Sequence, residues 1–140
     1  MKTIKSFSIL VLFLIVSSCG GLKSINPLSL LTGYSWSLSS LMGEGLDPSQ
    51  FTGTIPSLDF LEGGKLAGFS GCNNFSGSFS LEGTAVKLDP GAITKKACPS
   101  AGEQDFLSAI EKVSQLKVDQ NKLTLLDGAT ELMSFVPKND

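Results

Sequence analysis

Histidine and arginine are both absent from this chain of 140 residues, in which every one of the 11 basic residues is a lysine. Without histidine, the chain cannot build the Ser-His-Asp or Cys-His arrangements that activate a nucleophile, nor a zinc site with histidine ligands. Without arginine, it lacks the planar guanidinium that binds carboxylate or phosphate through two parallel hydrogen bonds. The composition therefore disfavours many enzyme classes, and we expect no catalytic, metal-binding or cofactor-binding residues.

The N-terminal apolar segment is too short to cross a bilayer as a helix, which takes about 20 residues. It covers residues 7–16, follows Lys2 and Lys5, and leads into a V-S-S-C sequence that ends at Cys19. A charged start, a short apolar stretch and small residues before a cysteine are typical of a bacterial lipoprotein signal. We therefore expect residues 1–18 to be removed and Cys19 to carry lipid. An ordinary cleaved signal and a buried core element are the alternatives.

This lipoprotein signal predicts a protein of the bacterial cell envelope that faces the periplasm and contacts the membrane through the lipid on Cys19. Gly20 follows the cysteine where an aspartate would favour the inner membrane, so the outer membrane is the expected location. The remaining 122 residues fit one domain. They hold nine lysines against 13 acidic residues, a formal charge of −4, and this makes nucleic acid an improbable partner.

Two cysteines remain once Cys19 is assigned to lipid. In an oxidising compartment, Cys72 and Cys98 are expected to form a disulfide that closes a loop of about 26 residues. Two buried thiols are the alternative. A catalytic thiol is less favoured because no imidazole is present to lower its pKa, although Lys95 and Lys96 lie close to Cys98 in the sequence.

The rest of the sequence predicts a mainly β (α+β) fold. Apolar and polar residues alternate in a series of short segments separated by turn residues, as in half-buried strands. These segments are residues 34–39, 58–60, 65–70, 75–81, 86–88, 116–118, 123–125 and 132–135. We expect a strongly curved antiparallel sheet or a small lipocalin-like barrel, with bulges or bends at Gly68, Gly71 and Gly77. The domain is expected at residues 33–137, after a lipidated N-terminus and flexible tether at residues 19–32.

One helix is expected at about residues 101–114, packed against the open side of the sheet. Ser100 and Glu103 have the spacing of a capping box, in which Glu103 reaches back to the backbone of Ser100. Phe106, Ile110 and Val113 then recur with helical spacing and form one apolar face, and Glu103 is expected to point outward with the other charged residues.

The segment Gly68–Gly77 (GFSGCNNFSG) is followed by Ile93–Cys98 (ITKKAC) and by an E-x-x-F helix start at Glu103. With these motifs the chain resembles the META domain family, the HslJ-like proteins of bacterial envelopes. The resemblance implies a small β-rich domain, often a lipoprotein, linked to heat-shock responses and antibiotic resistance, with no established enzymatic activity. The chain departs from the family's pattern at Lys95 and Lys96, where relatives often have Arg and Met.

The leading hypothesis is a non-enzymatic lipoprotein that acts in envelope maintenance, stress response or antibiotic tolerance by contacting an envelope protein or a small molecule. The candidate binding surface consists of Asn73, Asn74, Thr94, Lys95 and Lys96.

Two other functions remain open. A carrier would hold a small apolar ligand inside the curled sheet, and its cavity would be lined by aromatic residues that otherwise form the core. These residues are Tyr34, Trp36, Phe60, Phe69, Phe75, Phe79 and Phe135. An enzyme without histidine would need a pair of carboxylates for acid and base steps, from among Asp59, Glu62 and Asp89.

Overall fold

The computed structural model describes residues 25–99 and 101–139, so the expected signal peptide, Cys19 and Ser100 lie outside the described residues. The elements in chain order are α1 (Pro27–Thr32), β1 (Ser35–Leu41), β2 (Glu44–Gly45), the 3-10 turn η1 (Pro48–Gln50), β3 (Ser57–Leu61), β4 (Lys65–Phe69), β5 (Asn74–Glu82), β6 (Ala85–Ile93), α2 (Gly102–Lys112), β7 (Gln115–Val118), β8 (Leu123–Asp127) and β9 (Thr130–Pro137). In these ranges, no helix is long and apolar enough to pass through a bilayer.

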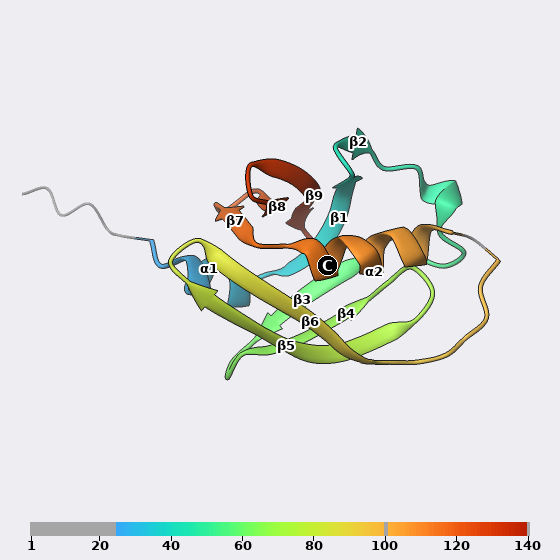
Figure 1. Cartoon of the computed structure of the whole chain (residues 1–140), viewed down its shortest axis with the longest axis horizontal. Coiled ribbons are helices and arrows are strands. Elements are labelled where there is room, and N and C mark those ends of the chain that lie inside the picture. The colour runs from blue at the N-terminus through green and yellow to red at the C-terminus, as the bar shows by residue number, and fades with distance from the viewer. Residues whose placement is uncertain (1–24, 100, 140) are drawn as a thin grey trace, which may run out of the picture.

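The nine strands form one antiparallel sheet that curls into a ring (Figure 1). Strands β1 and β3 to β9 pair in chain order, and β9 returns to pair with β1 from Trp36↔Pro137 to Leu41↔Met133. The short strand β2 pairs with β1 at its far end. The predicted mainly β fold with a strongly curved antiparallel sheet is therefore confirmed.

The pairing between β6 and β7 is the shortest in the ring. These strands share a single register pair, Ala85↔Gln115, with flanking backbone hydrogen bonds from Val86 to Ser114 and from Leu116 to Thr84. Helix α2 connects the two strands in the sequence, and Figure 1 shows it lying between β6 on one side and β7 to β9 on the other. The helix therefore covers the place where the sheet is least closed, as the sequence predicts.

Phe106 carries the apolar face of α2 into the interior of the ring. It is fully buried, and its ring centroid lies 6.3 Å from that of Phe75 on β5 and 6.4 Å from that of Phe135 on β9. One side chain of the helix thus bridges strands from opposite parts of the sheet. Such aromatic pairs add to the stabilisation that comes from burying the rings.

The interior of the ring is packed with apolar side chains. Phe60 and Phe79 meet edge to face with centroids 5.1 Å apart. Most of the aromatic residues that the sequence leaves open between core and cavity are less than a tenth exposed, namely Trp36, Phe60, Phe75, Phe79 and Phe135. Tyr34, by contrast, is 39% exposed. The buried aromatic residues therefore pack as a hydrophobic core.

The folded part of the chain begins before residue 33. Residues 27–32, expected to belong to a flexible tether, form helix α1, whose first turn is capped by the side chain of Asn26. Leu31 on this helix is fully buried, and its carbonyl accepts a hydrogen bond from the indole nitrogen of Trp36 at 3.1 Å. The buried leucine and this hydrogen bond attach α1 to the ring, because a buried indole N–H needs a partner.

Gly68 and Gly77 allow close packing, and both pair in regular register between β4 and β5. The register shifts lie between Leu38 and Ser40, between Phe75 and Ser76, and between Leu125 and Leu126, and the second of them falls at Gly91 of β6, which has a φ of +62°. A Cβ atom on Gly77 would lie 2.0 Å from the carbonyl oxygen of Asp89 on the neighbouring strand, and one on Gly68 would lie 2.3 Å from the ring of Phe75. Only glycine allows these approaches.

We expect Gly77→Ala to lower the free energy of unfolding by about 2 kcal/mol or more, because β5 or β6 must shift to admit the methyl group. Gly45→Ala is the matched control, since its Cβ would meet nothing within 4 Å and its backbone is not left-handed. Denaturant unfolding of both variants measures the difference. Equal stabilities would show that the sheet relaxes freely around residue 77.

Candidate functional site

The turn between β4 and β5 folds around a buried serine and a buried asparagine. The amide of Ser70 donates to the carbonyl of Asn73 at 2.8 Å, and the amide of Asn73 donates to the Ser70 hydroxyl oxygen at 3.1 Å. Ser70 is fully buried and Asn73 is 4% exposed. Between them, Gly71 adopts a φ of +96° and lies against the ring of Phe51, so this position requires glycine. The G-C-N sequence therefore forms a compact turn.

The side-chain amide of Asn73 holds the loop that follows β6. Its Oδ1 accepts hydrogen bonds from the amide of Lys96 at 2.7 Å and from the hydroxyl of Thr94 at 3.0 Å. Its Nδ2 donates to the carbonyl of Lys96 at 3.1 Å. Asn73 thus bonds both backbone groups of Lys96, as a neighbouring strand would. The loop is fixed to the turn without belonging to the sheet.

The first turn of α2 is joined to the same asparagine. Nδ2 of Asn73 also donates to both carboxylate oxygens of Glu103, at 2.9 and 3.1 Å, and the hydroxyl of Ser70 donates to the same carboxylate. The predicted capping box is wrong on this point. The N-cap of α2 is Ala101, which makes no side-chain cap hydrogen bond, and Glu103 turns inward to buried donors instead of outward.

Neither Ser70 nor Glu103 is identified as a site residue by the sequence. A carboxylate in the first turn of a helix matches the local capping pattern, so that pattern gives no reason to look for a distant partner. The signal that could have found the pair is the joint presence of G-C-N and E-x-x-F among the family motifs. We call Ser70, Asn73, Thr94 and Glu103 the Asn73 network.

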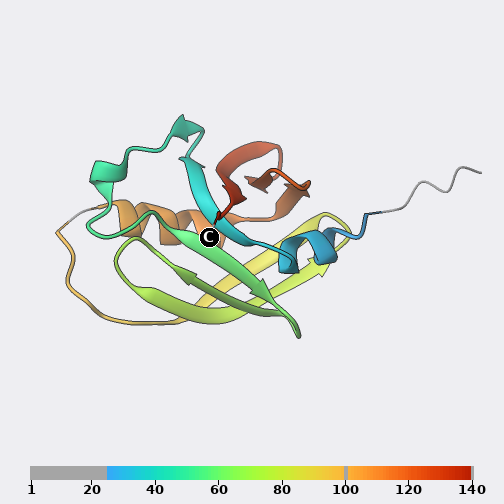
Figure 2. The same cartoon turned by 180° about the vertical axis from the view of Figure 1, so that it is seen from behind.

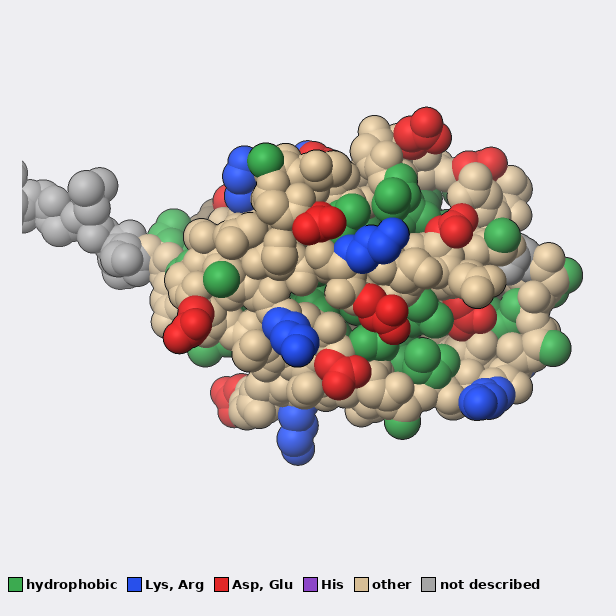
Figure 3. Space-filling view, viewed as in Figure 1, with side chains coloured by type: hydrophobic (Ala, Val, Ile, Leu, Met, Phe, Trp, Pro, Cys, Tyr) green, Lys and Arg blue, Asp and Glu red, His purple; other side chains and the backbone are tan. Residues whose placement is uncertain are grey.

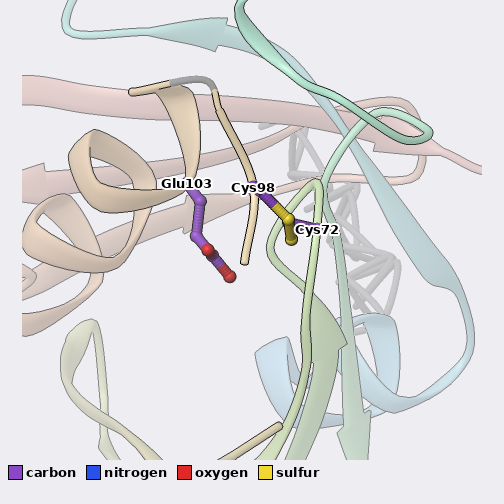
Figure 4. Close-up of side chains that lie close together, drawn as sticks. All are labelled: Cys72, Cys98 and Glu103. Carbon is purple, nitrogen blue, oxygen red and sulfur yellow. A yellow bond between two sulfur atoms is a disulfide. The ribbon is translucent and has the colours of Figure 1, made fainter. Parts of the chain in front are cut away.

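A disulfide between Cys72 and Cys98 ties the same turn to the same loop, as the sequence favours, with the Cα atoms 6.3 Å apart. In the described residues, the two sulfurs and a carboxylate oxygen of Glu103 form the one group of possible metal ligands, all within 4.8 Å (Figure 4). Bonded sulfurs are not thiolates, which are the form that binds metals. The carboxylate, moreover, is already hydrogen-bonded by Ser70 and Asn73. This donor set fits a structural cross-link.

The structure brings the five residues of the predicted binding surface together but does not expose all of them. The side chain of Asn73 is buried and has its hydrogen-bonding groups occupied, so it serves the fold. The others are exposed, namely Asn74, Thr94, Lys95 and Lys96. Thr94 is bonded to Asn74 through the backbone at 2.9 Å. The available surface therefore lies on the rim of the turn, around the Asn73 network.

An open groove of about 760 Å³ adjoins this rim on the outer face of the sheet. Asn74 lies at the end of the groove nearest the rim, and small or polar side chains of β1, β3 and β4 form its floor. The lining includes Ser37, Ser57, Asp59, Ala67, Phe69 and Lys138. Its volume lies in the range of small-molecule sites, and its lining offers hydroxyls, one carboxylate, one ammonium group and two aromatic rings.

The acids considered for catalysis are not brought to one site. Asp59 lines the groove, whereas Glu62 lines a different hollow, next to α1. The carboxylate of Asp89 accepts a hydrogen bond from the amide of Gly91 at 2.9 Å, within strand β6. Paired acid and base chemistry requires two carboxylates that face one substrate.

We expect Glu103→Ala to lower the free energy of unfolding by about 2 kcal/mol, because it leaves the buried Nδ2 of Asn73 without its carboxylate acceptor, whereas the Ser70 hydroxyl keeps the carbonyl of Asn73 at 2.8 Å. Glu111→Ala on the same helix is the control, since Glu111 is exposed and should cost less than about 0.5 kcal/mol. Thermal or denaturant unfolding measures both. A Glu103 variant as stable as the control would mean that water replaces the carboxylate.

A free-thiol count on the denatured, unreduced protein lacking Cys19 should find no free thiols, and the count after reduction should find two.

The Cys72→Ala/Cys98→Ala double variant should have a free energy of unfolding about 3.5 kcal/mol lower, because the unfolded chain gains entropy worth that much when a loop of this length is no longer closed. It should still fold, since Asn73 continues to hold the loop. Two reactive thiols before reduction would contradict the disulfide.

Solved structures of other proteins have the same fold, and a family model matches the sequence. No curated protein sequence matches the chain. An NMR structure of a protein from Burkholderia xenovorans is 23% identical, with a TM-score of 0.62 over 82% of this chain and 90% of that one. A crystal structure of a DUF4847 family protein from Bacteroides vulgatus ATCC 8482 is 15% identical, with a TM-score of 0.59 over 79% and 96%. These likenesses concern the fold. The family model of the META domain matches residues 29–140, and the chain therefore belongs to the META domain family.

Proposed function

We propose that this chain is an envelope lipoprotein, anchored through lipid on Cys19 and facing the periplasm, whose META domain works by binding and not by catalysis. The contact is with an envelope protein or a small molecule, and it serves envelope maintenance, stress response or antibiotic tolerance. The outer membrane is the proposed location because Gly20 follows the lipid site.

Two features support the compartment. The N-terminal lysines, short apolar segment and V-S-S-C sequence form the lipoprotein signal. The Cys72–Cys98 disulfide is of the kind that persists in an oxidising space and is rare where thiols are kept reduced. The N-terminal signal and the disulfide are separate observations, because they involve different residues of the chain.

The arrangement of reactive groups favours binding over catalysis. The two cysteines are bonded to each other, and the carboxylate of Glu103 is occupied by buried donors. Of the acids that could work as a pair, Asp59 and Glu62 line different hollows, and Asp89 is hydrogen-bonded to the backbone of its own strand. Histidine is the side chain whose ordinary pKa lies near neutral pH, where a general base works best, and the sequence contains none.

The groove beside the Asn73 network is the observation that carries the proposal. Its rim at Asn74 follows directly after the buried Asn73, so the hydrogen bonds and disulfide that fix the turn also fix the rim. A preformed surface loses less entropy when it binds than a mobile one. We infer that the partner occupies this groove and reaches the exposed side chains of Thr94, Lys95 and Lys96.

The alternative, a carrier that holds an apolar ligand inside the ring, is less well supported. The aromatic side chains that would line such a cavity pack against one another, as Phe60 does with Phe79. The ring of Phe106 further occupies the interior between Phe75 and Phe135. A ligand inside would have to displace this core, so the groove outside the sheet is the better candidate.

Deleting the gene should increase sensitivity to detergent, heat or antibiotic, and the wild-type gene should restore tolerance. A groove-filling Ala67→Phe variant should fail to restore it, because the ring would occupy the floor of the groove. Thr130→Phe, at an exposed position outside the groove lining, should restore tolerance fully. Survival assays under each stress measure the effect, and immunoblots check that the variants are equally abundant.

The anchor is tested separately by Cys19→Ala, which should move the protein from the membrane fraction to the soluble fraction.

In the deletion experiment, full tolerance in the strain that lacks the gene would contradict the proposed role. Full restoration by Ala67→Phe would leave the role standing but exclude the groove as the contact site.

A further inference from the structure

Three exposed apolar side chains gather at the end of the domain where the described chain begins. Ile25 is 57% exposed, Leu28 on α1 is 42% exposed and Leu61 at the end of β3 is 46% exposed. We call these three residues the anchor-end patch. Figures 1 and 2 show α1 and the β3–β4 turn together at this end from opposite sides.

Two residues of the anchor-end patch, Leu28 and Leu61, line a hollow of about 430 Å³. Leu28 lies on one wall and Leu61 on the other, and the lining also includes Phe79 and Leu81 of β5. Among the described residues that line it, Glu62 is the one that carries a charge. Figure 3 likewise shows hydrophobic side chains on the surface near the start of the described chain. The hollow is therefore suited to an apolar occupant more than to an anionic one.

The length of chain between this end and the lipid site limits where the domain can lie. Ile25 follows Cys19 by six residues, and a fully extended chain spans at most about 3.6 Å per residue. Ile25 must then lie within about 20 Å of a lipidated Cys19. Ile55 comes two residues before the start of β3, whose ends at Ser57 and Leu61 are about 13 Å apart along the strand.

We propose that the anchor-end patch rests on the bilayer, with Ile25, Leu28 and Leu61 reaching the boundary between headgroups and acyl chains. Apolar side chains that insert at this depth hold a surface element against a membrane. Glu62 follows Leu61, and Lys65 pairs with Leu61 across the β3–β4 hairpin, so the two neighbouring charges are opposite and the contact requires no anionic lipid. This inference rests on the proposed lipid anchor. It adds an orientation, in which η1 and β2 point away from the membrane.

The test uses the full lipidated protein in phosphatidylcholine vesicles whose acyl chains are brominated, since bromine quenches a nearby indole. Leu61→Trp should lose roughly half or more of its added emission, as expected for a side chain at the depth of interfacial helices. Leu28→Trp should behave alike, and Ile55→Trp, at a 37% exposed position, should be unaffected. The natural Trp36 is fully buried and gives the same background in every variant.

A second measurement requires no substitution in the domain. Amide hydrogen exchange of the vesicle-bound protein should be slower in α1 and the β3–β4 turn than in the unlipidated Cys19→Ala protein, and unchanged in η1. Quenching should not depend on added phosphatidylglycerol.

The outcomes separate the two proposals. A protein that floats with the vesicles but shows equal quenching at residues 61 and 55, or none at either, would overturn the orientation and leave the anchor standing. A protein that does not float would overturn the lipid anchor and this inference with it.

Discussion

The side-chain amide of Asn73 is the point at which three stretches of the chain meet. It belongs to the turn between β4 and β5, bonds both backbone groups of Lys96, and donates to the carboxylate of Glu103 at the start of α2. An aspartate there would face the carboxylate of Glu103 with a second negative charge and no donor. A glutamine would be longer by one methylene, which matters at a fully packed site. The disulfide depends on this arrangement, because the loop held by Asn73 brings Cys98 to Cys72.

The Asn73 network and the apolar core support each other through α2. Glu103 fixes the first turn of the helix to the β4–β5 turn, and one helical turn later Phe106 enters the ring between Phe75 and Phe135. The helix therefore has a polar attachment at its start and an apolar one along its inner face. Strand β5 takes part in both, since it begins directly after Asn73 and carries Phe75. We therefore expect a substitution in the β4–β5 turn to alter the packing of the core.

The regular parts of the fold could be predicted from sequence because their periods are local. Trp36 and Leu38 alternate with serines and face inward, and Phe106 and Ile110 recur with helical spacing and are buried. Helix α1 was missed because six residues are too few to show a period, and Asn26-Pro27 is also a turn signal.

The remaining differences involve partners far away in the sequence. Glu103 matches a local capping pattern, yet its partner Asn73 precedes it by 30 residues. Gly77 suggests a bulge until the carbonyl of Asp89 on the next strand is placed beside it. The groove could not be predicted, because four strands, a loop and the chain after β9 form it jointly. The closure of the ring also affects how the chain folds. Strand β1 completes its pairing only with β9, and the hydrogen bond between Ser39 and Ser134 on these strands joins residues that are 95 positions apart in the sequence. Closing so long a loop costs chain entropy before the contact repays it, which makes such pairing intrinsically slow. When the chain is synthesised from its N-terminus, one edge of its first strand therefore stays without its partner until the last strand has been made.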